Sequence, residues 1–285
     1  MAATFRAGDW VEVKGADEIG KTLDGEGTLD GLPFMPEMLE YCGRRFRLLR
    51  QAQKTCIELA AGDYRVREFR NNDVFLLQDL RCHGAHHGGC QRGCMVFWKM
   101  AWLRKVNNGD SATPSLPAFR ETLLSNLKTM TSPGRYYCQS TELVRATESK
   151  PLTRSRILLK CFYDLRSGAS GVFEMLGLIA KPLILKTADR FFGRRRLLGS
   201  LTRTPVGTLG LQPGETVEIK SLKEMQETLD NKGRNRGLVC DIELKPFCGK
   251  KYKVRSRIEC MISEPSGEMR KVESTVVLEG IRPPS

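Results

Sequence analysis

Hydrophobic and polar residues alternate over several short stretches of the chain, a pattern typical of β-strands with one buried face. Near the N-terminus the apolar positions are Trp10, Val11 and Val13, and further along the chain they are Val217 and Ile219. Each stretch follows a glycine and an acidic residue, which suit a turn. The pattern therefore predicts a first strand at both places.

The same succession of elements is predicted after each of these strands. Apolar residues at helical spacing predict a short helix or 3₁₀ turn, and alternating cationic and apolar residues then predict a strand. After a further hairpin, a last strand completes each set. The predicted helical turns lie at residues 16–23 and 222–229, the cationic strands at 44–49 and 250–254, and the last strands at 74–80 and 275–281.

A segment of different character lies between the two sets. Residues 94–106 would place apolar side chains on nearly every side of a helix, and residues 117–130 would place them on one side, so both predict helices. Residues 135–143 predict a strand. Residues 171–199 pass from an apolar half into a cationic half, which predicts an amphipathic connector helix.

The two sets are copies of one unit. Residues 8–52 align with residues 214–258 at a constant offset of 206 without a gap, and 14 of the 45 aligned positions are identical. Such similarity at a fixed offset indicates a duplicated structural unit. The sequence therefore predicts a mainly β protein with helical insertions (α+β), in which two small SH3-like or KOW-like barrels are joined by a helical, cysteine-rich middle segment.

This organisation divides the chain into four predicted parts. The first copy continues into a cysteine cluster that begins at Cys82, whereas the second copy has Pro283 at the corresponding place. The predicted parts are a first barrel-like repeat (1–82), a Cys/His-rich motif with helices (82–145), a helical basic connector (146–207) and a second barrel-like repeat without its cysteine motif (208–285).

The net charge of +13 favours contact with polyanions or acidic surfaces. Nucleic-acid binding is compatible with that charge and with a KOW-like barrel. It is not the favoured function, because the aromatic residues are sparse and the basic residues are spread widely. The 172–199 segment permits peripheral membrane contact, although a solvated cationic face explains it more simply. The sequence shows no transmembrane segment and no apolar signal core, so we expect a cytoplasmic protein.

The cysteines and histidines are concentrated in one region. Of 10 cysteines, Cys82, Cys90 and Cys94 form a C-x7-C-x3-C run, and all three histidines lie between the first two of them. In the expected reducing compartment these cysteines are metal ligands or buried thiols and not disulfides. Glycines between them permit tight folding around a centre. The fourth ligand of such a centre is predicted to be Cys56, Cys138 or one of the histidines, represented by His87.

The spacing leaves the chemistry of this cluster open. A structural zinc site takes four Cys or His ligands, and an iron–sulfur cluster takes four thiolates, so both cofactors remain candidates. The pattern is also compatible with buried reduced thiols that bind no metal and with a redox or catalytic thiol. Cys42 and Cys248 share one context in the two copies, which indicates a structural role. The same role is predicted for Cys161 and Cys240.

Motifs of known enzyme classes are absent from the sequence. It contains no phosphate-binding loop, no dinucleotide-binding glycine motif, no nucleophile elbow and no H-E-x-x-H zinc motif. We therefore expect a non-enzymatic, metal-binding interaction or accessory protein with a protein partner. The sequence also permits an iron–sulfur redox or catalytic protein, or a nucleic-acid-binding protein.

Several motifs together resemble a known family. They are GLPFMPEMLEYCGRRFR, LRCHGAHHGGCQRGCMVFWKMAWL, RYYCQSTEL and LQPGETVEIKS, which cover nearly the whole chain. The resemblance is to an uncharacterised bacterial family of about three hundred residues, whose members carry a Cys-rich motif ending in a Trp-rich helix after each repeat. It implies a duplicated organisation and no established activity. This chain departs from the family pattern in lacking the second Cys-Trp block.

Overall fold

The computed structural model describes residues 5–60, 63–106, 117–149, 197–205, 207, 209–240 and 242–281. The chain divides into two compact units. The first unit contains residues 1–176 together with residues 260–270, and the second contains residues 177–259 and 271–285. These units differ from the four predicted parts, because the predicted parts 1–82 and 82–145 lie together in the first unit.

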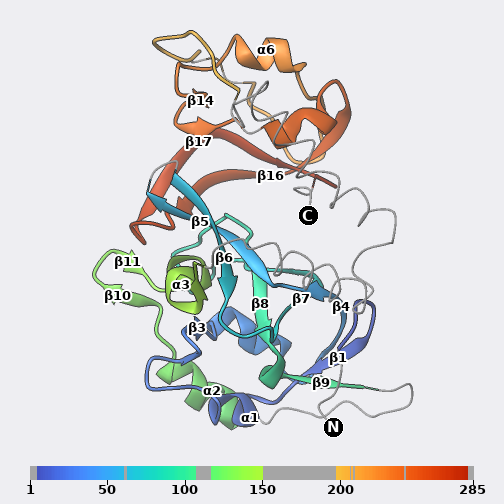
Figure 1. The fold of residues 1–285 in the computed structure, drawn as a ribbon, viewed down its shortest axis with the longest axis vertical. Helices are drawn as coiled ribbons and strands as arrows, with labels where there is room; N and C mark the ends of the chain where they lie inside the picture. The colour runs from blue at the N-terminus through green and yellow to red at the C-terminus, as the bar shows by residue number, and fades with distance from the viewer. Residues whose placement is uncertain are drawn as a thin grey trace. The chain divides into compact units, whose positions relative to one another are not determined.

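A five-stranded antiparallel sheet is the centre of the first unit (Figure 1). Its order is β8-β7-β4-β1-β9, and it curls into a half-barrel. The two edge strands are consecutive in sequence and are separated only by the three-residue 3₁₀ turn η2 (Met100–Trp102). So short a connection requires the two edges to lie close together, which explains the curl. The strands are β1 (Trp10–Val13), β4 (Arg45–Gln51), β7 (Val74–Arg81), β8 (Met95–Lys99) and β9 (Leu103–Lys105).

The prediction of a helix over residues 94–106 is therefore wrong. Val96 and Trp98 are buried at alternate positions of β8, and Trp98 pairs with Phe75 of β7. An apolar run that would cover every side of a helix also fits two short strands joined by a bend. Here the aromatic side chains and the free edge of β7 favour strands.

Aromatic residues from this segment fill the core of the first unit. Trp98 and Trp102 are completely buried. The ring of Phe34 lies edge-on to both, with ring centroids 6.4 Å from Trp98 and 5.3 Å from Trp102. The core thus joins the β8–η2 segment to Phe34, which lies between β1 and β4 in the sequence. Among the described residues, the predicted cysteine-rich part therefore has no core of its own.

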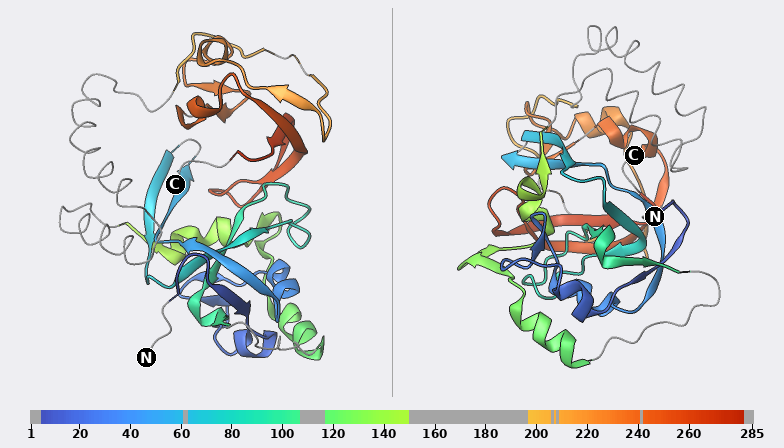
Figure 2. Two further views of the ribbon diagram at one scale, coloured as in Figure 1. Left: turned by 90° about the vertical axis from the view of Figure 1, so that its right-hand side faces the viewer. Right: turned by 60° about the horizontal axis from the view of Figure 1, so that its bottom comes forward.

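Short elements cover the sheet and its open end. Helix α2 lies beside α1, as Figure 2 shows, and ends at Asn126, whereas the sequence predicts a helix up to residue 130. The elements are α1 (Ala16–Gly20), β2 (Thr28–Leu29), β3 (Leu32–Pro33), the 3₁₀ helix η1 (Pro36–Tyr41), α2 (Pro117–Asn126) and the β10–β11 pair (Met130–Ser132 and Arg135–Tyr136).

A second sheet of the first unit consists of a long hairpin and one short strand. The hairpin is β5 (Lys54–Ala60) and β6 (Asp63–Phe69), and β12 (Thr147–Glu148) pairs with β6. Before β12 the chain forms helix α3 (Gln139–Ala146), so the strand predicted over residues 135–143 is wrong beyond Tyr136. The side chain of Thr141 accepts the Cys138 amide at 3.0 Å, and this reciprocal capping begins a helix.

The elements of the second unit recur at the offset of the sequence repeat. Val11 pairs with Phe46 in the first copy, and Val217 pairs with Tyr252 in the second, so the register is the same. Each of the following short elements also begins and ends 206 residues after its counterpart: α6 (Leu222–Gln226), β14 (Arg234–Asn235), β15 (Leu238–Val239) and the 3₁₀ helix η3 (Ile242–Phe247). The remaining strands are β13 (Thr216–Glu218), β16 (Lys251–Ile262) and β17 (Met269–Leu278), of which residues 260–262 and 269–270 belong to the first unit.

The connector predicted over residues 171–199 lies almost entirely outside the described residues. In the described part of the chain, no helix combines the length and the apolar character that a membrane span requires.

Candidate functional site

The β7–β8 strand pair brings the first and last cysteines of the C-x7-C-x3-C run together. Cys82 follows the last residue of β7, and Cys94 precedes the first residue of β8. The backbone amide of Cys82 donates to the carbonyl of Cys94 at 2.9 Å. The two residues are therefore neighbours at the end of the β7–β8 pair, although twelve positions separate them in the sequence.

The loop between these cysteines folds back tightly and returns Cys90 to the same place. The amides of His87 and Gly89 both donate to the carbonyl of Gly84 at 2.9 Å. Gly84 has a φ of +69°, and a Cβ atom there would lie 2.2 Å from the carbonyl oxygen of Cys90. Only glycine permits that approach, so the glycines of the loop set the position of Cys90.

Helix α3 brings a fourth cysteine, Cys138, which is its N-cap residue. The next residue, Gln139, anchors the helix to the edge of β8. Its side-chain amide donates to the carbonyl of Phe97 at 2.8 Å and to that of Pro33 at 3.0 Å, and its oxygen accepts the amide of Phe97 at 2.9 Å. A buried glutamine thus fixes the start of α3 against the strand that follows Cys94.

The four thiols influence one another electrostatically. Burial is the main cause that raises the pKa of Cys82 to about 12, and the charges of Glu37, Cys94 and Cys138 add to it. Burial likewise raises the pKa of Cys94 to about 11, where Cys138 and Cys90 contribute and Arg92 opposes. We call Cys82, Cys90, Cys94 and Cys138 the four-thiol site. Cys82 and Cys94 are therefore protonated at neutral pH unless a cation stabilises the thiolates.

Hydrogen-bond donors point at three of these sulfur atoms. The amide of Ile262, within the 260–270 segment of the first unit, donates to the Sγ of Cys90 at 3.3 Å. The amide of Gly84 acts in the same way on Cys82, and the amides of Ser140 and Thr141 act on Cys138. The amide of Gly84 lowers the pKa of Cys82, and the amides of Ser140 and Thr141 lower that of Cys138, so at these two cysteines the backbone favours the thiolate form in opposition to burial.

His87 lies in the middle of the loop, but both of its ring nitrogens are already bonded. Nδ1 lies 2.6 Å from Oε1 of Glu37, and Nε2 lies 2.9 Å from the carbonyl oxygen of Tyr137. A carbonyl oxygen only accepts, so Nε2 carries a hydrogen. His87 therefore ties the cysteine loop to η1 and to the residue before Cys138, and it has no nitrogen available as a metal ligand in this arrangement.

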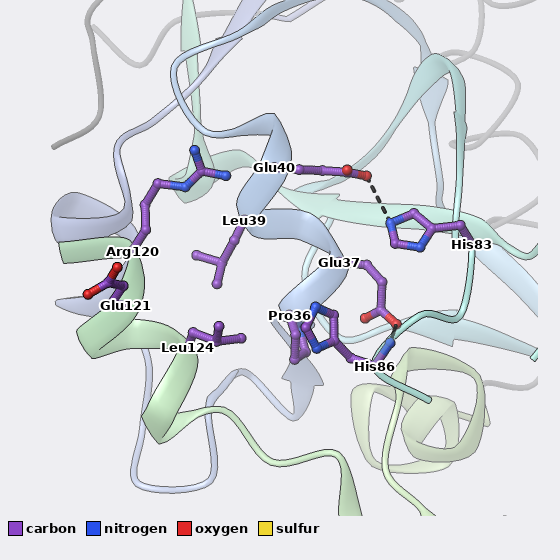
Figure 3. A pocket seen from close by; sticks show the side chains of 9 residues that line it. All are labelled: Pro36, Glu37, Leu39, Glu40, His83, His86, Arg120, Glu121 and Leu124. Carbon is purple, nitrogen blue, oxygen red and sulfur yellow. Dashed lines mark hydrogen bonds and ion pairs between the residues drawn. The ribbon is translucent and has the colours of Figure 1, made fainter. Parts of the chain in front are cut away.

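The other two histidines line a separate pocket of about 200 Å³ beside the loop (Figure 3). The Nε2 of His83 lies 3.0 Å from Oε1 of Glu40, and the Nδ1 of His83 accepts the amide of Ala85 at 3.3 Å. Figure 3 shows Leu39 of η1 and Leu124 of α2 between the histidines and the side chains of Arg120 and Glu121, which complete the lining. Both histidines therefore contribute to this pocket.

The remaining predicted ligand, Cys56, is placed elsewhere. It is exposed on β5, where it pairs with Val66. Cys42 is buried in the core next to η1, in keeping with the structural role predicted for it. Cys161 lies outside the described residues. Of the candidates for a fourth ligand, only Cys138 accompanies Cys82, Cys90 and Cys94.

The described residues include no group of three or more Cys, His, Asp or Glu side chains that are arranged to hold a metal ion. The four thiols act on one another electrostatically, but they do not form a coordination shell. Their chemistry nevertheless suits a thiophilic cation, since thiolates are the soft ligands that bind zinc and iron–sulfur clusters.

Sequence reasoning missed the groups that position the cysteines. Glu37 and Gln139 were assigned no role, and the contact between Ile262 and Cys90 joins residues 172 positions apart. Glu37 carried one usable signal, because it is identical in both copies, where its counterpart is Glu243. The contacts of Gln139 and of Ile262 cannot be recognised from the sequence of one copy.

Comparison of this chain with protein-family models, with curated proteins and with solved structures found no match.

Proposed function

We propose that Cys82, Cys90, Cys94 and Cys138 bind a metal centre that stabilises the fold of a non-enzymatic interaction or accessory protein. The observation that carries this proposal is the set of backbone amides directed at Cys82, Cys90 and Cys138. A neutral thiol is a weak acceptor, whereas a thiolate accepts such bonds strongly. The backbone is therefore organised for anionic sulfur, and a bound cation would supply the charge that makes anionic sulfur stable in a buried place.

The positions of the four thiols indicate a structural role for the metal. Cys82 and Cys94 belong to the end of the β7–β8 pair, Cys90 belongs to the loop, and Cys138 begins α3. One centre would join the sheet, the loop and the helix. The raised pKa values of Cys82 and Cys94 argue against a nucleophilic thiol, which requires a lowered pKa.

Zinc and an iron–sulfur cluster both accept four cysteines, and zinc is our first choice. A closed four-cysteine shell is the usual structural zinc site. The iron–sulfur cluster is supported by the amide hydrogens directed at the sulfurs, because such bonds also tune the potential of a cluster. A cluster would make the protein a redox or catalytic protein.

We further infer that both copies of the repeat fold as SH3-like barrels and that a protein partner binds this scaffold. What supports the barrels is the common register of β1–β4 and β13–β16 together with the curled sheet of the first copy. Small barrels of this kind serve many functions, so the fold by itself does not identify the partner.

The test is metal analysis of the full chain purified without oxygen, together with its visible spectrum. We expect about one zinc per chain and a colourless protein. Cobalt substitution should give the absorption of a tetrahedral thiolate site, and zinc uptake by the metal-free protein should release protons. Iron with acid-labile sulfide would select the cluster instead. No metal under any of these conditions would refute the proposal.

Serine variants identify the ligands. Cys90→Ser and Cys138→Ser are expected to lose the metal or to bind it far more weakly. Cys56→Ser, at an exposed position, and Cys42→Ser, at a buried position outside the site, are the matched controls and should retain it. If Cys56→Ser loses the metal while Cys138→Ser keeps it, the four-thiol assignment is wrong.

A further inference from the structure

A segment that is remote in sequence lies against the four-thiol site. Residues 260–270 belong to the second copy by sequence, but they are part of the first compact unit. The amide of Gln91 donates to the carbonyl of Cys260 at 3.1 Å, and the amide of Ile262 donates to the Sγ of Cys90 at 3.3 Å. The segment therefore runs along the loop that carries the central cysteine.

Glu264 is the most densely bonded side chain described in this segment. Its Oε1 accepts Nη2 of Arg92 at 2.7 Å and the hydroxyl of Ser140 at 2.9 Å. Its Oε2 accepts the backbone amide of Glu58 at 3.0 Å. With only 9% of its side chain exposed, this carboxylate is largely shielded from water. Charge-assisted bonds of this kind are strong and directional.

Two of the partners of Glu264, Arg92 and Ser140, are close in sequence to cysteines of the four-thiol site. Arg92 stands between Cys90 and Cys94, and Ser140 is the second residue after Cys138. One oxygen of Glu264 thus joins the cysteine loop to the start of α3. These are the two parts of the chain that must stay together if Cys138 is to share a centre with the other three cysteines.

We propose that Glu264 is a positioning residue for the four-thiol site, so that the second copy supplies an outer-shell group to the centre of the first. This inference rests on the proposed metal-binding function. Groups that orient metal ligands without touching the metal typically change metal affinity by 10–100-fold when they are replaced.

The experiment compares Glu264→Gln and Glu264→Ala with the matched control Glu268→Gln in the full chain. Glu268 lies in the same segment and is exposed, so its substitution removes the same charge without disturbing the site. Zinc affinity is measured by competition with a chelator, and the cobalt spectrum is recorded for each protein. We expect both Glu264 variants to bind zinc 10–100-fold more weakly, with a changed cobalt–thiolate band, and Glu268→Gln to match the wild type.

A second measurement separates this inference from the metal proposal. The rate at which iodoacetamide modifies Cys90 and Cys138 is measured in metal-free protein by mass spectrometry. If Glu264 positions the thiols, modification is faster in Glu264→Ala and unchanged in Glu268→Gln. A wild type that binds no metal refutes the metal centre, and the alkylation rates then still decide the role of Glu264. Unchanged alkylation together with unchanged zinc affinity overturns the inference.

Discussion

His87 and Glu37 form a buried pair, in which Nδ1 of the histidine lies 2.6 Å from Oε1 of the glutamate and each side chain is only 1% exposed. A second pair of the same residue types, His83 and Glu40, lies nearby at 3.0 Å but is nearly half exposed. Both pairs connect the cysteine loop to η1. Their difference in burial makes them a natural comparison of what such a pair contributes to stability.

Replacing His87 with alanine is expected to lower the free energy of unfolding by about 3–5 kcal/mol, because it leaves the buried Glu37 carboxylate without its partner. It also removes the bond to the carbonyl of Tyr137. The change is measured by urea unfolding of the metal-free protein.

The control for this variant is His83→Ala, which should cost less than about 1 kcal/mol because solvent screens an exposed pair. Equal losses in the two variants would show that the buried pair stabilises the fold no more than the exposed pair does, and that His87 does not anchor the loop.

The same pair predicts a pH dependence in acid. Burial acts to raise the pKa of Glu37, but its hydrogen bond to His87 and the charge of that residue outweigh burial and place the pKa below its ordinary value of 4.5. A carboxyl whose pKa is lowered by folding stabilises the protein above its unfolded pKa, and this contribution is lost as the pH falls through the folded pKa. The free energy of unfolding should therefore decrease progressively below about pH 4.5.

Other carboxyls titrate in the same range, among them Asp30, whose bond to Lys99 lowers its pKa. The diagnostic quantity is thus the difference between the wild type and Glu37→Gln. That difference should shrink as the pH falls below 4.5. A difference that stays constant down to pH 3 would contradict the assignment.

The thiols of the metal-free protein should react in a defined order. At pH 8 a group with a pKa of about 12, as for Cys82, is ionised in roughly one molecule in ten thousand, and Cys94 with a pKa of about 11 in roughly one in a thousand. Cys56 is exposed and should be alkylated first. Mass spectrometry of partially alkylated protein measures the order, and zinc should further protect the four-thiol site alone. Rapid labelling of Cys82 would indicate a reactive thiol.

The sequence allowed the repeat and the first strands to be predicted, because Val11 and Val217 lie in alternating runs at one constant offset. It failed where tertiary pairing decides. Val96 and Trp98 belong to an apolar run that suits a helix or two strands, and the free edge of β7 selects strands. Residues Gln139 to Leu143 had β-compatible side chains, but the capping contact of Thr141 begins α3.

Part of the candidate site could likewise be predicted from the sequence, and part could not. Cys82, Cys90 and Cys94 are close in sequence, so their convergence could be predicted from glycine-rich spacing alone. Selecting Cys138 over Cys56 requires knowing that Gln139 binds the edge of β8. Excluding His87 as a metal ligand requires knowing that Glu37, fifty positions away, is bonded to its Nδ1. Spacing identifies local ligands, whereas the positioning groups come from contacts across the fold.

Two glycines of the cysteine loop offer a last test of how its geometry is fixed. Gly84 and Gly89 both have positive φ, +69° and +73°, so alanine at either position should cost about 1–2 kcal/mol in backbone strain. At Gly89 the added Cβ would meet no atom within 4 Å, whereas at Gly84 it would lie 2.2 Å from the Cys90 carbonyl oxygen. That oxygen belongs to the backbone and cannot move without displacing Cys90. We therefore expect Gly84→Ala to cost about 1–3 kcal/mol more than Gly89→Ala and to lower metal affinity, while Gly89→Ala keeps it. Urea unfolding and zinc competition measure both quantities, and equal metal affinities in the two variants would mean that the turn at Gly84 does not set the position of the central thiol.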